Sequence, residues 1–164
     1  MSAPHHAVVE AVLTVDPVVE AVESALQTRG EGCGAVCTFV GIVRATHQGR
    51  RVKFLEYEAH AALATKMFDR ISGEIAGAWP DAVVVIHHRI GRLSVGEASV
   101  VIAAASAHRA ASFQVCRYAI ERVKQIAPVW KHEFFDDGDA WVEGPVANPD
   151  DDAMRRLALE RACA

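Results

Sequence analysis

The apolar residues of this chain alternate between short β-type runs and two long segments with helical spacing. The helical segments, residues 61–79 and 107–126, end at Pro80 and Pro128, and proline cannot continue a helix. The strand-like runs cover residues 33–43, 52–59, 82–91, 97–106 and 129–135. This order predicts an α+β fold, in which helices pack against a mostly antiparallel sheet.

Local signals add detail near the N-terminus. Residues 8–13 are typical of a short strand, and Asp16 followed by proline predicts the start of a helix that stops at Gly30. The runs at 33–43 and 52–59 are separated by a polar loop that contains glycine, which suggests a hairpin.

The division of the chain is expected to be simple. Residues 1–144 should form a single domain, and residues 145–164 should form a linker and a short C-terminal helix. The chain has 164 residues, of which 51% are apolar, so one domain can bury a core of useful size.

Charge and hydropathy exclude several classes of partner. The net charge of −4 gives no attraction to nucleic acid or to an anionic membrane, so a bound anion needs a local basic cluster. No segment resembles a signal peptide, and the apolar stretch near residues 100–105 is too short to span a bilayer. We therefore expect a cytoplasmic protein with reduced thiols.

Common metal and nucleophile motifs are missing from the sequence. There is no phosphate-binding glycine loop and no GxSxG nucleophile elbow. Cys33 and Cys37 share a strand face, but no further ligands follow at organised spacing, so a zinc site is not expected. His87 and His88 are adjacent in a strand, so we expect one side chain to point inward and the other outward, both with structural roles.

Basic residues mark the ends of several predicted elements. His108 and Arg109 begin the helix at 107–126, where the helix dipole disfavours cations unless an anion binds there. Arg44 follows a strand, Lys124 lies in the last turn of that helix, and Lys131 lies beyond Pro128. Taken alone, Arg44 is better explained as a solvated strand end, Lys124 suits the end of a helix in any case, and Lys131 is unremarkable.

The spacing of these groups bears on the assembly. Lys124 and His108 are sixteen positions apart on one helix, which corresponds to roughly 24 Å. Two side chains cannot close that gap around one small ligand. If the groups share a site, they come from different subunits of a two-fold dimer.

At these residues the sequence resembles the large, catalytic subunit of molybdopterin synthase. The resemblance covers about residues 34–144 and rests on stretches in the family's order: GAVCTFVGIVR (34–44), LEYEAH (55–60), IHHRIGRLSVGE (86–97), SAHRAASF (106–113), KQIAPVWKHE (124–133) and WVEG (141–144). It implies an α/β hammerhead-type fold and a central homodimer with one small subunit at each end, a 2+2 heterotetramer.

The resemblance also implies the chemistry. The small ubiquitin-like partner carries a thiocarboxylate on its C-terminus, and its sulfur is transferred to cyclic pyranopterin monophosphate. Two transfers build the dithiolene of molybdopterin in molybdenum cofactor biosynthesis. No metal or organic cofactor is needed for this step.

Site residues are carried over from the same stretches. Lys124 is the leading catalytic residue, as a general acid/base or as a transient acyl partner, and its neighbour Lys131 is the second. The expected substrate-binding residues are Ile42, Val43, Arg44, His108, Arg109, Lys124, Lys131, His132 and Glu133. The chain departs from the family at Ile42, where lysine is frequent, and at Pro145, where a basic residue is common.

Two other functions fit the sequence. A dimeric binding module for an anionic metabolite would need the basic pocket but not Lys124 in particular. A scaffold subunit would bind the ubiquitin-like partner without catalysis, and the changes at Ile42 and Pro145 are the features that favour it.

Overall fold

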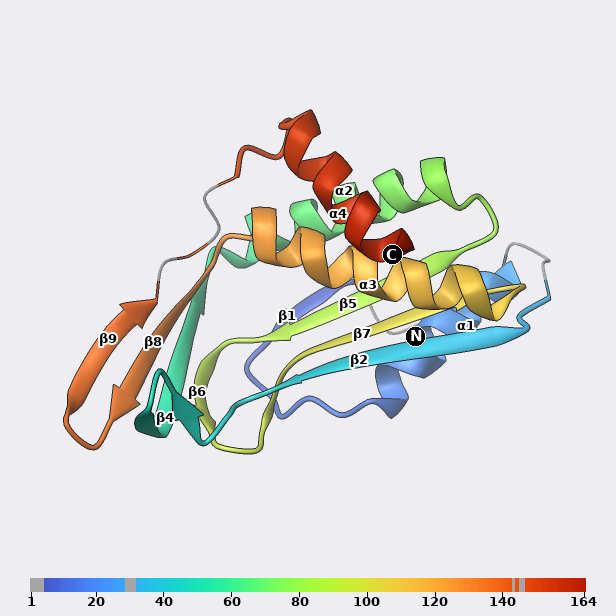
Figure 1. Cartoon of the computed structure of the whole chain (residues 1–164). Coiled ribbons are helices and arrows are strands. Elements are labelled where there is room, and N and C mark those ends of the chain that lie inside the picture. Colours follow the sequence, from blue (N-terminus) through green and yellow to red (C-terminus); the bar gives the residue numbers. More distant parts are fainter. Residues whose placement is uncertain (1–4, 29–31, 143, 145–146) are drawn as a thin grey trace.

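The core of the molecule is a four-stranded sheet with helices on both faces (Figure 1). The computed structural model describes residues 5–28, 32–142, 144 and 147–164. The strands run in the order β1 (Ala7–Val9), β5 (Val83–Arg89), β7 (Ala98–Ser106) and β2 (Ala35–Ile42). β1 pairs with β5 in parallel, and the other pairs are antiparallel.

Helices cover both faces of this sheet. On one face, α2 (Ala61–Ala78) and α3 (Arg109–Ile126) pack on side chains such as Ile86 and Ile102. On the other face, α1 (Asp16–Thr28) packs on Val85 and Val101. The prediction that one histidine of the pair at 87 and 88 points outward is therefore wrong. Both are buried, because neither face of β5 is open to solvent.

A smaller antiparallel sheet lies at one end of the core (Figure 1). Its strands are β3 (Thr46–His47), β4 (Arg50–Ala59), β8 (Val129–Phe135) and β9 (Gly138–Val142), with β6 (Gly91–Ser94) paired to β4. A third cluster of buried side chains, including Leu55, Leu93 and Phe135, packs on one of its faces. The predicted α+β class is confirmed, with the strands divided between two sheets.

The predicted hairpin between residues 33–43 and 52–59 is wrong. β2 pairs along its whole length with β7, and β4 pairs with β8 and β6. The hairpin in this region is the short one between β3 and β4, whose turn residues Gln48 and Gly49 have φ of 48° and 77°. The first strand is also shorter than predicted and covers Ala7–Val9, and the predicted helix stop at Gly30 lies outside the described residues.

The C-terminal helix predicted near the end of the chain is α4 (Asp152–Cys163), which packs on α3. Beneath it, Arg122 is fully buried and donates to the Glu74 carboxylate at 2.7 and 2.8 Å. Gln125 donates to the carbonyl of Met154 at 3.0 Å, so α4 is tied to α3 by buried polar contacts.

Candidate active site

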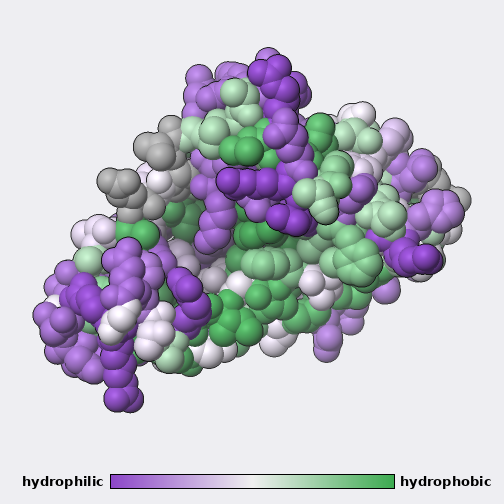
Figure 2. Space-filling view, viewed as in Figure 1, coloured by the Kyte–Doolittle hydropathy of each residue, from purple (hydrophilic) through white to green (hydrophobic). Residues whose placement is uncertain are grey.

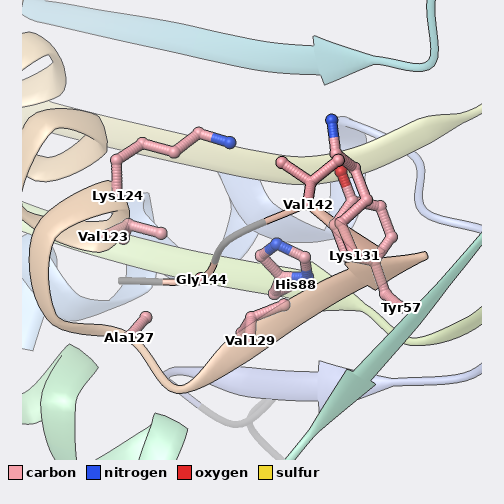
Figure 3. Close-up of a pocket in the computed structure, with 9 residues that line it drawn as sticks. All are labelled: Tyr57, His88, Val123, Lys124, Ala127, Val129, Lys131, Val142 and Gly144. Carbon is pink, nitrogen blue, oxygen red and sulfur yellow. The ribbon is translucent and has the colours of Figure 1, made fainter. Parts of the chain in front are cut away.

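A pocket opens where the last turn of α3 meets β8 (Figure 3). The cavity has a volume of about 240 Å³. It is lined by Tyr57, His88, Val123, Lys124, Ala127, Val129, Lys131, Val142 and Gly144. The side chains of Lys124 and Lys131 extend toward the same space, with the imidazole of His88 below them (Figure 3).

Lys124 reaches this pocket because α3 ends directly after it. The helix runs to Ile126, Ala127 caps it, and Pro128 turns the chain into β8. Burial lowers the pKa of Lys124, and the nearby charges of Lys131 and Arg44 lower it further. The side chain is still open to solvent on one side, so its desolvation is partial.

Lys131 is held by a buried carboxylate. Its Nζ lies 2.7 Å from Oε1 of Glu133, two residues along β8 and therefore on the same face of the strand. The second oxygen of Glu133, Oε2, contacts Nδ1 of His47. Burial would raise the pKa of Glu133, but the hydrogen bonds from Lys131 and His47 outweigh it and leave that pKa below its ordinary value.

A smaller cavity adjoins the first. It is lined by Ile42, Val43, Arg44, Thr46, His47, Val52, Leu55, Tyr57, Lys131 and Glu133. Tyr57 and Lys131 line both cavities. The structure therefore brings six of the expected site residues into adjoining pockets: Ile42, Val43, Arg44, Lys124, Lys131 and Glu133.

Two polar residues of the pocket, Tyr57 and His88, were not expected from the sequence. Their rings meet edge-to-face with centroids 5.1 Å apart. Burial lowers the pKa of His88 to about 4, the bond to the Arg89 carbonyl opposes this, and the charge of Lys124 adds to it. His88 is therefore neutral at pH 7, so it contributes polarity to the pocket without adding positive charge.

Three expected residues do not reach this pocket within one chain. His132 points from the opposite face of β8, where Nε2 pairs with Asp139 at 2.6 Å and the ring stacks on Trp141. His108 and Arg109 lie at the other end of α3, exposed, in a separate hollow beside Gly34. The departure from the family at Pro145 lies outside the described residues.

In the part of the chain that the structure describes, no group of three or more His, Cys, Asp or Glu side chains is arranged to hold a metal ion. Nor does any helix in those residues have the length and apolar character needed to cross a membrane.

Comparison with known proteins is decisive for the family. The family model described as MoaE protein matches residues 9–126, from β1 to the end of α3. The chain belongs to the MoaE family. The matched segment contains Arg44, His108, Arg109 and Lys124, and it ends before Lys131.

Relatives of this MoaE-family chain agree over most of its length. It is 41% identical over 142 residues to the molybdopterin synthase catalytic subunit of Halalkalibacterium halodurans, covering 87% of each chain. The crystal structure of molybdopterin synthase from Staphylococcus aureus superposes with a TM-score of 0.79 at 34% identity, covering 86% of this chain and 98% of that one.

A third likeness concerns the fold alone. A complex of subunits 1 and 2 of molybdopterin-converting factor from Helicobacter pylori contains a chain that superposes with a TM-score of 0.70. The identity is 19%, with 90% of this chain and 98% of that chain covered. The two-sheet architecture is thus kept at low sequence identity.

Proposed function

We propose that this MoaE-family chain is the catalytic subunit of a molybdopterin synthase. Sulfur transfer to the substrate takes place in the pocket that Lys124 and Lys131 line. The sulfur comes from the thiocarboxylated C-terminus of a small ubiquitin-like subunit. The acceptor is cyclic pyranopterin monophosphate, on which two transfers form the dithiolene. The observation that carries the proposal is the convergence of Lys124, Lys131 and Arg44 on two adjoining pockets, both of which Lys131 lines.

The charge of the pocket suits these reactants. Both the thiocarboxylate and the pterin phosphate are anions, and the chain as a whole has a net charge of −4, so attraction depends on this local cluster. The lowered pKa of Lys124 makes its neutral amine more available near neutral pH than that of an ordinary lysine. Lys124 therefore acts as general acid/base or as a transient acyl acceptor, and Lys131 and Arg44 hold the anionic groups.

His108 and Arg109 enter the site through a homodimer built on β2. This strand is the last in the order of its sheet, and Figure 2 shows apolar residues gathered along the band where β2 runs beside α3. Ile42 and Phe113 are the large apolar residues exposed on these two elements, at 56% and 63%. Burial of this band between two copies is the expected use of such a surface.

The lengths of the two elements agree with this arrangement. β2 has 8 residues and is therefore roughly 26 Å long, close to the roughly 24 Å between His108 and Lys124 along α3. The start of β2 lies beside the start of α3, since the Gly34 amide donates to Ser106. Antiparallel pairing of two β2 edges would bring His108 and Arg109 of one copy toward Arg44 of the other. With one small subunit at each pocket, the assembly is a 2+2 heterotetramer.

The experiment that tests the function is sulfur transfer in vitro. The purified chain is mixed with pterin phosphate and thiocarboxylated small subunit, and dithiolene formation is compared between wild type and Lys124→Ala. Lys66→Ala is a matched control, because Lys66 is an exposed lysine on α2. We expect product from wild type and from Lys66→Ala, and a large loss with Lys124→Ala.

Other outcomes would redirect the assignment. Product from all three proteins would keep the enzyme but remove Lys124 from the chemistry. No product from any of them, together with binding of the small subunit, would favour a scaffold. Binding of the pterin phosphate, with no product and no binding of the small subunit, would favour a binding module. A cytoplasmic location remains our prediction.

A further inference from the structure

The Glu133 carboxylate has both of its oxygens occupied. Oε1 pairs with Nζ of Lys131 at 2.7 Å, and Oε2 contacts Nδ1 of His47. The Glu133 side chain is 3% exposed, whereas those of Lys131 and His47 are each 24% exposed. Because Glu133 is buried and each of its oxygens already has a partner, its effect on the pocket acts mainly through these two partners.

His47 is brought to this carboxylate by a tight hairpin. It pairs with Arg50 across the β3–β4 turn, whose two central residues, Gln48 and Gly49, both have positive φ. Such a two-residue turn fixes the register of its flanking strands. The imidazole therefore reaches Glu133 from a defined backbone position, although the two residues are 86 positions apart in the chain.

We propose that His47 is a positioning residue for the sulfur-transfer site: by sharing the Glu133 carboxylate, it keeps Lys131 oriented toward Lys124 and only partly neutralised. The role of His47 in the reaction rests on the proposed function, whereas its effect on the charge around Lys124 and Lys131 does not. With His47 in place, Glu133 divides its charge between two donors. Without it, the same carboxylate turns wholly to Lys131 and cancels more of the positive charge that faces Lys124.

Charged and titratable groups from several strands face Lys124 and Glu133, the two ends of this chain of contacts. Lys124 is faced by Lys131 from β8, Arg44 beyond the end of β2 and His88 from β5. Glu133 is faced by Lys131, by His47 from β3 and by Tyr57 from β4, whose pKa it raises in addition to the effect of burial.

Substitutions at the two linked residues should therefore have opposite effects. His47→Ala removes one of the two partners of Glu133, so less of the carboxylate's negative charge is compensated locally and the ammonium form of Lys124 is favoured. Glu133→Gln removes the negative charge, so the neutral amine is favoured. Simple loosening of the pocket would hydrate Lys124 in both variants and shift both in the same direction. The sign of the two changes thus separates an electrostatic positioning role from a structural one.

The test measures the reactivity of Lys124 in the free chain, without substrate or partner. Acetic anhydride at limiting concentration acetylates neutral amines, and the extent at Lys124 is read by peptide mass spectrometry against exposed Lys66 over a range of pH. We expect the rate to fall on the order of threefold in His47→Ala and to rise on the order of threefold in Glu133→Gln. His47→Asn, which keeps a donor for Glu133, should lie nearer to wild type than His47→Ala does.

The control is His60→Asn, which changes a histidine that caps α2 through an acceptor that asparagine retains. An unchanged rate in His47→Ala, a change of the same sign in His47→Ala and Glu133→Gln, or equal effects of His47→Asn and His47→Ala would each overturn the proposal. Lack of sulfur transfer by the wild-type chain would overturn the proposed function instead, and it would leave these rates as they are.

Discussion

Lys124 and Lys131 face one pocket from the two sides of the turn at Pro128, one from the last turn of α3 and the other from β8. Two ammonium groups in one cavity repel each other, and the repulsion adds to burial in lowering the pKa of Lys124. An anion bound between them would remove this penalty. The empty pocket thus makes proton loss from Lys124 easier than from an ordinary lysine, and the same charges attract an anion.

The first prediction concerns the pH profile of sulfur transfer. Arg44→Ala removes one of the charges that lower the pKa of Lys124, so this pKa should move back toward that of an ordinary lysine. The neutral amine then forms only at higher pH, so the acid limb of the kcat–pH profile should shift to higher pH. Arg51→Ala, an exposed residue that lines neither cavity, is the control and should leave the limb in place.

The second prediction tests whether the two ends of α3 serve different sites. Lys124→Ala and Arg109→Ala should each be inactive as pure dimers. After dissociation and random reassociation of a 1:1 mixture, half of the dimers contain one of each, and each of these has one intact site. The mixture should regain about a quarter of wild-type activity if subunits share sites. Absence of any recovery, with exchange shown by mass spectrometry, would contradict the sharing of sites between subunits.

A third prediction concerns the buried ion pair beneath α4. Burial would raise the pKa of Glu74, but hydrogen bonds from Arg122, Tyr118 and Arg70 outweigh it and lower that pKa. Its contribution to stability is therefore present at neutral pH and is lost as the pH falls through the folded-state pKa. Glu74→Gln leaves a buried charge on Arg122 without its partner and should cost about 3–5 kcal/mol at pH 7.

Urea unfolding at pH 7 and at a pH below the ordinary pKa of glutamate measures this difference. The gap between wild type and Glu74→Gln should narrow on acidification, because wild-type Glu74 then becomes neutral as well. Glu160→Gln, at an exposed position of α4, should leave the free energy of unfolding nearly unchanged at both values. A gap that widens in acid would contradict the assignment.

A fourth prediction compares two glycines that have open space around them. A Cβ at Gly49 or at Gly73 would meet no heavy atom within 4 Å, so only the backbone decides. Gly49 has φ of 77° in the β3–β4 turn, and Gly49→Ala should destabilise the fold by about 1 kcal/mol. Gly73 lies inside α2, and Gly73→Ala should stabilise it by up to about 1 kcal/mol. Shifts of the thermal unfolding midpoint with the same sign in both variants would contradict this prediction.

A fifth prediction addresses the division of the chain at residue 144, which stays a prediction. Ala158 and Ala162 of α4 belong to the same buried cluster as Val115 and Ala119 of α3. Removal of residues 145–164 should therefore lower the thermal unfolding midpoint while a folded domain remains. A truncated chain that is unfolded by circular dichroism would show that the tail is part of the domain.

The elements were predictable from sequence where local chemistry decides them. The helix at 107–126 has apolar spacing and ends at a proline, and the observed α3 differs from it by two residues at its start. The partner of β2 was not predictable, because pairing with β7 joins segments far apart in the chain. The burial of both His87 and His88 also depends on α1 covering the second face, which strand alternation cannot reveal.

The site shows the same limit. Lys124 and Lys131 could be grouped from sequence because a short turn at Pro128 joins their elements. Strand alternation alone also indicates that His132 and Glu133 face opposite ways, as observed. The contact of His47 with Glu133 joins β3 to β8 across the sheet, and no pattern in the sequence predicts it.

In the proposed homodimer, the outer edge of β2 has a cost for a protomer that has not yet paired with a second copy. A strand with an open row of backbone donors and acceptors will pair with any extended segment, and an apolar band beside it lowers the barrier to doing so. Refolding at rising chain concentration should therefore yield irregular aggregates in competition with dimers. Newly made chains avoid this outcome only when correct pairing is faster than misassembly.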